Sequence, residues 1–366
     1  MNKVLKCFYD FSLAPASYDF FTFLISAELC RIRRGCDSIA LYFVKGPNEG
    51  FREKSPRPYE TNINFFHNVI IPGIAILPTC KKFYYLNRDE IKEINLIDQE
   101  IFPRGYSINS PVAEYKSHEL VAASIRGDKP AKFKAPTYAL KLVDSFFRKI
   151  NTKKKIITLT TREIVQNDSN NKRAINKYAW KSIFSEAEKH NIFPIVIRDT
   201  NNMFDKEKLF SNVYELSSAS LHLHFRLALY EKSFLNFIKG NGPEQLIKFG
   251  NCNAVYFYEF HEKFNATSSA WFKKNFGMIE GSNFPMTTQN FNYVWGQETV
   301  EKIESSFKYK FTKDQNKETN PINSKESLMA SIEISLKHLI KCLSFSVLSE
   351  DIYLMYSIDN LNKKGL

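Results

Sequence analysis

Residues 155–199 read KIITLTTREIVQNDSNNKRAINKYAWKSIFSEAEKHNIFPIVIRD, and this stretch decides the fold. Residues 156–160 and 192–197 are runs of mostly apolar residues and predict two strands. Between them, apolar residues recur at every fourth position from Ile175 to Ala187, which is the spacing of a helix that packs on a sheet. A strand, a helix and a second strand in this order predict a parallel unit that binds nucleotides just beyond its strand ends.

A second polar loop lies further along the chain. Residues 221–238 are apolar over most of their length and predict a buried helix. The loop that follows this helix consists of Asn241, Gly242, Pro243, Glu244 and Gln245. Gly before Pro at the start of another helix leaves backbone N–H groups that can bind an anion, and Glu244 can hold a ribose hydroxyl. An ordinary turn between two helices is the competing interpretation, and the sequence leaves both open.

The first half of the chain repeats the alternation of strands and helices. Residues 4–9 and 38–44 predict two strands. Between them, residues 20–34 predict an amphipathic helix, which Asp19 caps at its start and Gly35 ends. Two such halves predict an α/β fold with two Rossmann-type, parallel-sheet domains that face a cleft.

The expected domain boundaries follow from this alternation. We expect a first domain at residues 1–150 and a second at residues 151–345, and the basic cluster at residues 153–155 marks the boundary between them. Residues 328–348 predict a long amphipathic helix, and we expect residues 346–366 to return to the first domain.

Three stretches give weaker signals. Residues 68–80 are apolar but are broken by Pro72, Gly73 and Pro78, so they predict a strand or a loop rather than a long helix. Residues 101–138 contain four prolines and predict no regular structure, and residues 311–327 are polar and predict a loop.

The composition narrows the class of protein. The chain has 366 residues, which is enough for two domains, and a net charge of +12. The lysines are scattered and do not interleave with aromatic residues, so we expect no nucleic-acid partner, whereas a peripheral contact with an anionic membrane stays compatible with the charge. The six cysteines form no CxxC pair, and no stretch reaches the roughly 18 apolar residues of a membrane span, so we expect a cytoplasmic protein.

Arg162 opens the polar loop after the first strand of the second half, and Asp199 follows the next strand. An arginine at the carboxyl end of a parallel strand can bind a diphosphate through paired, charge-assisted hydrogen bonds. The competing interpretation is an ion pair between Arg162 and either Glu163 or Asp199.

The loop after the first strand carries two carboxylates, Asp10 and Asp19, together with Ser12 and Tyr18. In a two-domain α/β enzyme this loop faces the cleft, so either aspartate could act as a base toward an acceptor hydroxyl. A helix cap is the simpler role for Asp19.

The sequence contains no pattern of metal ligands. His222 and His224 are two positions apart on a predicted helix, about 200° around its axis, so they cannot share a metal ion. The chain also lacks the GxGxxG, Walker and GxSxG motifs. We therefore expect neither a metal nor another cofactor.

The residues of the central stretch also resemble a known family. Residues 158–202 resemble the donor half of GT-B glycosyltransferases, and they are most similar to a loosely defined group of bacterial sugar transferases, distantly similar to fucosyltransferases. Other segments share this resemblance, namely YDFSLAPASYDFFTFLISAELCR (9–31), GPNEGFR (46–52), RLALYEKSFLNFIKGNGPEQL (226–246) and PMTTQNFNYVWG (285–296).

The resemblance implies a metal-independent enzyme whose first domain binds an acceptor and whose second domain binds a nucleoside-diphosphate sugar. It places Arg162 at the donor phosphates, the loop from Asn241 to Gln245 near the nucleotide, and a terminal helix that crosses back to the first domain. Asp10 is then the expected catalytic base, and the expected acceptor-side residues are Ser12, Tyr18, Asp19 and Arg52. Where fucosyltransferases have paired arginines this chain has one, which leaves the identity of the donor open.

The predicted function is therefore transfer of a sugar from a nucleoside-diphosphate sugar to a hydroxyl acceptor, as in the synthesis of a surface glycan or polysaccharide. One alternative is a sugar-nucleotide epimerase of the same shape, which needs no acceptor. The other is a basic, non-catalytic binding protein, whose affinity for nucleic acid would depend steeply on salt. The sequence does not indicate the stereochemical outcome or the oligomeric state.

Overall fold

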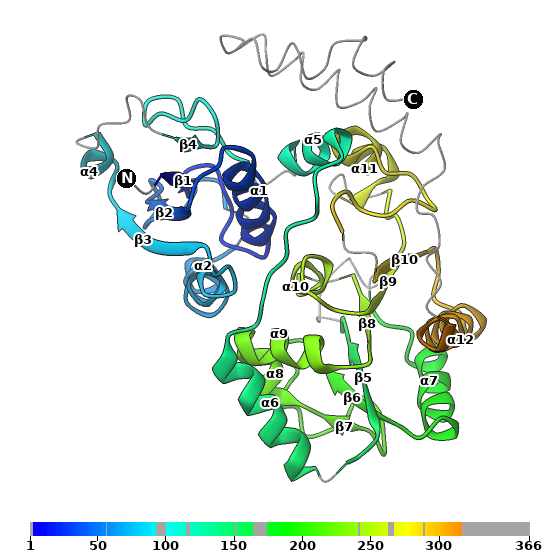
Figure 1. Ribbon diagram of the computed structural model, residues 1–366. Helices are drawn as coiled ribbons and strands as arrows, with labels where there is room; N and C mark the ends of the chain where they lie inside the picture. The colour runs from blue at the N-terminus through cyan, green and yellow to red at the C-terminus, as the bar shows by residue number, and fades with distance from the viewer. Residues whose placement is uncertain are drawn as a thin grey trace, which may run out of the picture.

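The computed structural model of the chain contains two parallel β-sheets with helices around them (Figure 1). The structure describes residues 3–55, 57–92, 100–114, 118–150, 152–163, 174–240, 242–262, 267–287 and 290–316.

The first sheet has four parallel strands in the order β3-β2-β1-β4. Their bounds are Val4–Asp10 for β1, Ser38–Val44 for β2, Cys80–Leu86 for β3 and Ile101–Phe102 for β4. Helix α1 (Asp19–Arg33) connects β1 to β2, and Gly35, with a φ of 61°, turns the chain after it. Aromatic side chains of β1, β2 and α1 pack together beneath this helix, which makes the first half rigid where it meets the second.

The second sheet has six parallel strands in the order β10-β9-β8-β5-β6-β7. Their bounds are Lys155–Thr160 for β5, Ile192–Ile197 for β6, Tyr214–Glu215 for β7, Leu235–Lys239 for β8, Ala254–Tyr258 for β9 and Phe291–Trp295 for β10. The chain winds outward from β5 in one direction and then from β8 in the other. The predicted fold class, α/β with two parallel-sheet units, is confirmed.

Helices cover both faces of the second sheet (Figure 1). On one face α7 packs beside α12, and on the other α9 packs beside α6 and α8. The bounds of the helices in this half are Thr137–Lys149 for α6, Lys177–Lys189 for α7, Ser217–Leu221 for α8, Leu223–Lys232 for α9, Glu244–Lys248 for α10, Ser269–Phe276 for α11 and Val300–Asn316 for α12.

The prediction of a strand or loop for residues 68–80 was wrong. This part of the chain is helical, with α2 at Tyr59–Phe65, a π-helix at Phe66–Ile70 and α3 at Ile71–Ile74. The three pieces run on without a break, and Pro72 lies directly after the π-helical turn, a place where the helical hydrogen-bond pattern changes. The stretch 101–138 also contains a helix, α5 (His118–Arg126), and α4 (Arg88–Lys92) follows β3.

The prediction of one helix over residues 221–238 was also wrong. Helix α9 ends at Lys232, Ser233 is extended, and β8 begins at Leu235. An apolar run does not distinguish a buried helix from a buried parallel strand, because both have apolar neighbours on every side. The loop after residue 240 therefore follows a strand, as a nucleotide-binding loop does. Helix α12 likewise extends through residues 311–316, which were expected to form a loop.

The domain boundary near residue 150 stays a prediction. Helix α6 precedes it, yet α6 packs against α9 of the second half. The expected terminal helix at residues 328–348 and the expected return at residues 346–366 lie outside the described residues. None of the helices in the described part of the chain is long and apolar enough to cross a membrane.

Candidate active site

A cavity of about 890 Å³ lies between the two halves. One wall comes from the start of α1, the residues before it, and the helical segment at residues 57–69. The other wall comes from the carboxyl ends of β5, β6 and β8, together with α9, α10 and α11. This is the cleft that the fold class predicts.

The cavity lies over the point where the second sheet changes its direction of winding. Arg162 follows β5 and Gly240 follows the neighbouring strand β8, and Arg162 Nη1 donates a hydrogen bond to the Gly240 carbonyl at 3.0 Å. Strands β5 and β8 are the pair whose connections leave in opposite directions, so a crevice forms between their loops. The guanidinium of Arg162 lines this crevice.

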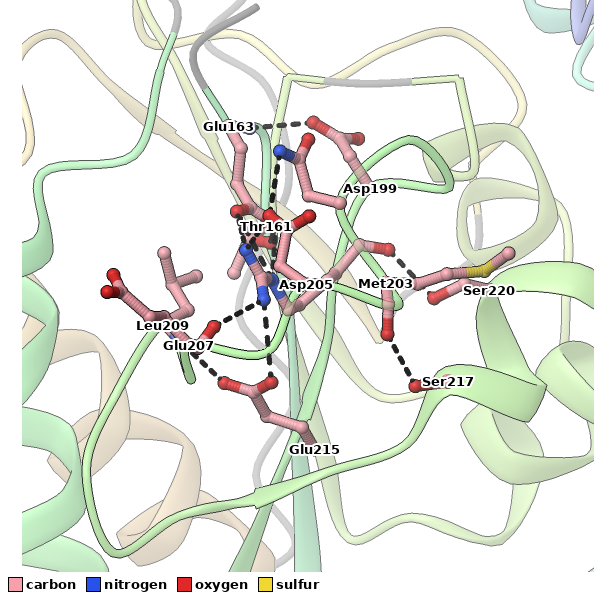
Figure 2. A network of polar contacts seen from close by, with 12 residues as sticks. Thr161, Glu163, Asp199, Met203, Asp205, Glu207, Leu209, Glu215, Ser217 and Ser220 are labelled. Carbon is pink, nitrogen blue, oxygen red and sulfur yellow. Dashed lines mark hydrogen bonds and ion pairs between the residues drawn. The ribbon is translucent and has the colours of Figure 1, made fainter.

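Arg198, directly after β6, holds the neighbouring loops in place. Figure 2 shows the carboxylates of Glu163, Asp205 and Glu215 turned toward one guanidinium group. That group belongs to Arg198, whose Nη2 lies 2.6 Å from Glu163 Oε2 and 3.1 Å from Asp205 Oδ2. Sequence reasoning suggested Glu163 as a partner for Arg162, but its carboxylate accepts hydrogen bonds from Nε and Nη2 of Arg198. We interpret Arg198 as structural because three carboxylates surround it.

Asp199 lines the cavity beside this network. Its carboxylate accepts the backbone N–H of Glu163 at 2.6 Å. Burial raises the pKa of Asp199, although this hydrogen bond and the nearby charges of Arg162 and Arg226 oppose the shift. The carboxylate is thus fixed at the end of β6 with one side toward the cavity.

Arg226 is a cavity residue that the sequence did not indicate. It projects from α9, is 3% exposed, and donates from Nε to the Ala219 carbonyl. The Tyr18 hydroxyl of the first half also bonds Arg226, and burial raises the pKa of Tyr18 against this interaction. The one available signal was a single arginine inside the apolar run LHLHFRLALY.

The loop at residues 242–245 contacts the first half directly. A Cβ on Gly242 would lie 2.4 Å from Tyr18 Cδ2, so only glycine permits this approach. Gln245 Oε1 accepts a hydrogen bond from Thr22 Oγ1 at 3.3 Å. The Glu244 carboxylate accepts from Lys248 Nζ at 2.9 Å and from the Tyr256 hydroxyl. The alternative of a turn between two helices is excluded because β8 precedes the loop.

Asp19 is the cavity carboxylate of the first half. Tyr18 occupies the cap position, so Asp19 is the first residue of α1 and not its cap. The Ser17 hydroxyl donates to Asp19 Oδ2 at 2.8 Å, and Arg57 lies nearby. Water in the cavity reaches this carboxylate, but protein atoms of both halves surround it, and this burial raises its pKa. A carboxylate of raised pKa in a cleft is suited to general-base chemistry.

Asp10, the expected catalytic base, does not line the cavity. Its side chain has no exposed surface. Its carboxylate accepts hydrogen bonds from Arg88 Nη1 at 3.1 Å, the Tyr106 hydroxyl at 2.9 Å and the Ser12 N–H at 2.9 Å. Because its oxygens accept these hydrogen bonds and do not reach the cleft, we interpret Asp10 as a residue that stabilises the fold. This geometry argues against its predicted role.

The predicted site residues thus divide into two groups. Those that line the cavity are Tyr18, Asp19, Arg162, Asp199, Gly242, Pro243, Glu244 and Gln245. Asp10, Ser12 and Arg52 do not line it, and Asn241 lies outside the described residues. Their roles in binding or catalysis stay predictions.

The histidine pair differs from its prediction. His222 precedes α9 and accepts the Phe225 N–H at 3.2 Å, so the two histidines do not share a helix as expected. His224 Nε2 lies 2.5 Å from the Pro72 carbonyl of the first half. No group of three or more His, Cys, Asp or Glu residues within the described ranges could hold a metal ion.

Comparison with known proteins identified structures of similar shape. A family 9 glycosyl transferase from Veillonella parvula is 8% identical, with 94% of this chain and 97% of that chain covered and a TM-score of 0.48. The ADP-heptose heptosyltransferase II of Escherichia coli is 6% identical, with 86% and 99% covered and a TM-score of 0.44. The fucosyltransferase NodZ from Bradyrhizobium is 10% identical, with 68% and 94% covered and a TM-score of 0.30. No family model and no curated protein matches the chain. At these low sequence identities the similarity concerns the fold alone and not the substrates.

Proposed function

We propose that the protein is a glycosyltransferase that moves a sugar from a nucleoside-diphosphate sugar to a hydroxyl acceptor. One observation carries the proposal: the cavity joins arginines at the switch point of the second sheet to a carboxylate of raised pKa on the first half. Positive charge on one wall and a base on the other are what this reaction needs.

The donor would bind along the second half. Arg162 and Arg226 would contact the diphosphate, together with the loop at residues 242–245. Asp199 lies at the end of β6, the second strand of the β5-α7-β6 unit. In nucleotide-binding units of this kind a carboxylate at that place binds the ribose hydroxyls. We assign Asp199 this role.

The reaction would then use both walls. The acceptor hydroxyl attacks the anomeric carbon of the donor sugar and its proton passes to Asp19. The bond between that carbon and the diphosphate oxygen breaks, and the electron pair stays on the diphosphate. Arg162 and Arg226 stabilise the charge that develops there. A raised pKa makes Asp19 a stronger base than an ordinary carboxylate.

We further propose that the two arginines supply the positive charge that a metal ion provides in other transferases. Transfer should then continue in the presence of a chelator such as EDTA. Loss of activity with EDTA, restored by a divalent cation, would contradict this part of the proposal. The expected place in glycan or polysaccharide synthesis stays a prediction.

The proposal is tested by calorimetry with a panel of nucleoside diphosphates. In Arg162→Ala we expect the affinity for the preferred diphosphate to fall by about 10- to 100-fold, because charge-assisted hydrogen bonds are lost. Arg148→Ala is the matched control, since Arg148 is exposed on α6 and bonds Ser145 of its own helix. Unchanged affinity in Arg162→Ala would overturn the assigned role.

A second measurement separates transfer from epimerisation. The protein is incubated with the preferred nucleotide-sugar, with and without a panel of hydroxyl acceptors, and the sugar products are identified. Transfer releases the diphosphate in an acceptor-dependent manner. A changed sugar that remains on the nucleotide would instead indicate the epimerase.

A further inference from the structure

The cavity has two chemically different ends along the second sheet. One end, near β5 and β6, is polar and contains Arg162, Asp199 and Arg226. The other end is built by β9, α11 and β10. We name it the aromatic end, and it is lined by Tyr258, Trp271, Phe272, Phe276, Phe284 and Tyr293.

The rings of the aromatic end contact one another at large angles. The Trp271 and Phe276 rings are 5.0 Å apart at 82°, and the Phe276 and Phe284 rings are 4.9 Å apart at 59°. The Tyr258 ring is 6.3 Å from the Tyr293 ring at 74°, and it is tilted by 38° against the Phe272 ring at 5.0 Å. Rings at such angles form the walls of a pocket rather than one flat platform.

Three polar side chains at this end, those of Lys248, Tyr256 and Thr267, are bonded within the protein. Lys248 Nζ is 2.9 Å from Glu244 Oε1 and lies 4.0 Å from the centre of the Phe284 ring. The Tyr256 hydroxyl bonds Glu244, and Thr267 Oγ1 donates to the His261 carbonyl at 3.3 Å. A ligand rich in hydroxyl groups would lose its hydrogen bonds to water here and form few new ones. Burial of an apolar group would instead be favourable.

The proposed base lies toward the aromatic end. Thr22, about one turn after Asp19 on α1, donates a hydrogen bond to Gln245 at 3.3 Å. The neighbouring Glu244 accepts from Lys248, which contacts the Phe284 ring, and the charge of Glu244 acts on Asp19. The preceding residue, Tyr18, turns instead to Arg226 and Asp199 at the polar end. The proton acceptor of the reaction is therefore on the aromatic side of the proposed phosphate position.

A nucleobase stacked in the aromatic end is the rival occupant. It would put the nucleoside on the side opposite to Asp199, the carboxylate assigned to the ribose. It would also leave Asp19 facing the nucleoside, away from any acceptor hydroxyl. The positions of the two carboxylates favour an acceptor.

We infer that the aromatic end binds the acceptor, an alcohol whose hydroxyl is carried next to an aromatic ring, such as an aryl glycoside. The inference rests on the proposed function, and it narrows the acceptor class of the same cavity. The aromatic group packs among Trp271, Phe276 and Tyr258, and the hydroxyl beside it points to Asp19.

The test compares phenyl β-glucoside with methyl β-glucoside, which differ only in the apolar group. Binding of each to the full chain is measured by calorimetry, with and without the preferred nucleoside diphosphate. We expect the phenyl compound to bind at least about tenfold more tightly, because its ring leaves water. Trp271→Ala and Phe276→Ala should each remove most of this preference.

Two further variants keep the test decisive. Tyr178→Ala is the matched control, since Tyr178 is 80% exposed on α7, and it should leave the preference unchanged. If an alanine variant does not fold, Trp271→Leu and Phe276→Leu keep an apolar side chain without the aromatic ring and should still weaken phenyl binding. Equal binding of the two glucosides, or displacement of the phenyl compound by a free nucleoside, would overturn the inference.

The outcomes also separate this inference from the proposed function. Nucleotide binding without a phenyl preference would overturn the inference and leave the donor site in place. A Trp271-dependent phenyl preference without any nucleotide binding would support the aromatic end and overturn the glycosyltransferase proposal.

Discussion

An aspartate stands on each side of the loop between β1 and α1, and the two have opposite surroundings. Asp10 is fully buried and accepts hydrogen bonds from Arg88, Tyr106 and the Ser12 backbone. Asp19 faces the cavity between the halves and is bonded by the Ser17 hydroxyl of its own loop. One carboxylate is paired with Arg88 inside the fold, and the other lines the cavity.

This contrast shows what decides the role of an aspartate in such a loop. The donors that occupy Asp10 come from residues 88 and 106, on segments that are distant in sequence. The groups that act on Asp19 come from Arg57 and, across the cavity, from Glu244. The residue type is the same, and the partners brought by the fold separate the two roles.

Among the variants that test this contrast, Asp19→Asn should have the largest effect. We expect kcat to fall by about 10²- to 10⁴-fold, because the amide cannot accept the acceptor proton. Affinity for the nucleoside diphosphate, measured by calorimetry, should be retained. A variant with kcat near that of the wild type would remove Asp19 from the mechanism.

Asp10→Asn tests the other side of the contrast. The change removes the charge that Arg88 binds and leaves part of a buried network without its partner. We expect the free energy of unfolding to fall by about 2 kcal/mol, measured by urea denaturation. At a temperature where the variant is folded, its kcat should be close to that of the wild type. A loss of kcat as large as in Asp19→Asn would restore Asp10 as the base.

Gly242→Ala probes the contact that brings Asp19 to the donor half. The new methyl group would overlap the Tyr18 ring, so the halves must separate slightly or the ring must move. We expect a loss of about 1–3 kcal/mol in the free energy of unfolding, which is typical of overpacking. Tyr18→Ala in the same chain should recover part of this loss. Additive losses in the double variant would show that the two residues do not meet.

Removal of the Asp19 charge should change the stability less than removal of the Asp10 charge, and in the opposite direction. Burial raises its folded pKa above the unfolded value, so the charged form is disfavoured in the native state. The penalty is absent below the unfolded pKa and fully present above the folded pKa. Asp19→Asn should therefore keep or raise the unfolding free energy at pH 7, as seen by urea denaturation. A clear loss of stability at pH 7 would mean that Asp19 also serves the fold.

The smallest expected effect concerns Arg57. Its charge lowers the pKa of Asp19 against the effect of burial. In Arg57→Gln the acid limb of the profile of kcat/KM against pH should move to higher pH, because Asp19 then protonates more easily. An acid limb that stays in place or moves to lower pH would show that another group controls it.

Much of the fold could be predicted from periodicity and turn residues. The strands at residues 38–44 and 192–197 have the expected bounds, because each is a short apolar run between polar turns. The prediction of one helix over residues 221–238 was wrong because an apolar run fits a buried helix and a buried strand equally well. Pro72 suggested a break in the helix, although the chain accommodates it directly after a π-helical turn.

The site was harder to predict than the fold. Arg162 and Asp199 could be named because they directly follow predicted strands, where parallel sheets bind ligands. Arg226 could not be named as a site residue, because it lies within a helix whose inward face depends on tertiary packing. The separation of Asp10 from Asp19 also depends on contacts between distant segments, and local patterns carry no information about those.

The position of α6 affects how the chain folds as it leaves the ribosome. This helix is made with the first half, yet Val143 is buried and Phe146 contacts Phe225 of α9, which is made later. Until α9 is complete, the apolar face of α6 stays exposed to water, and we expect a chaperone to bind it. For the same reason, a fragment that stops before Thr137 should be less prone to aggregation than one that stops at residue 150.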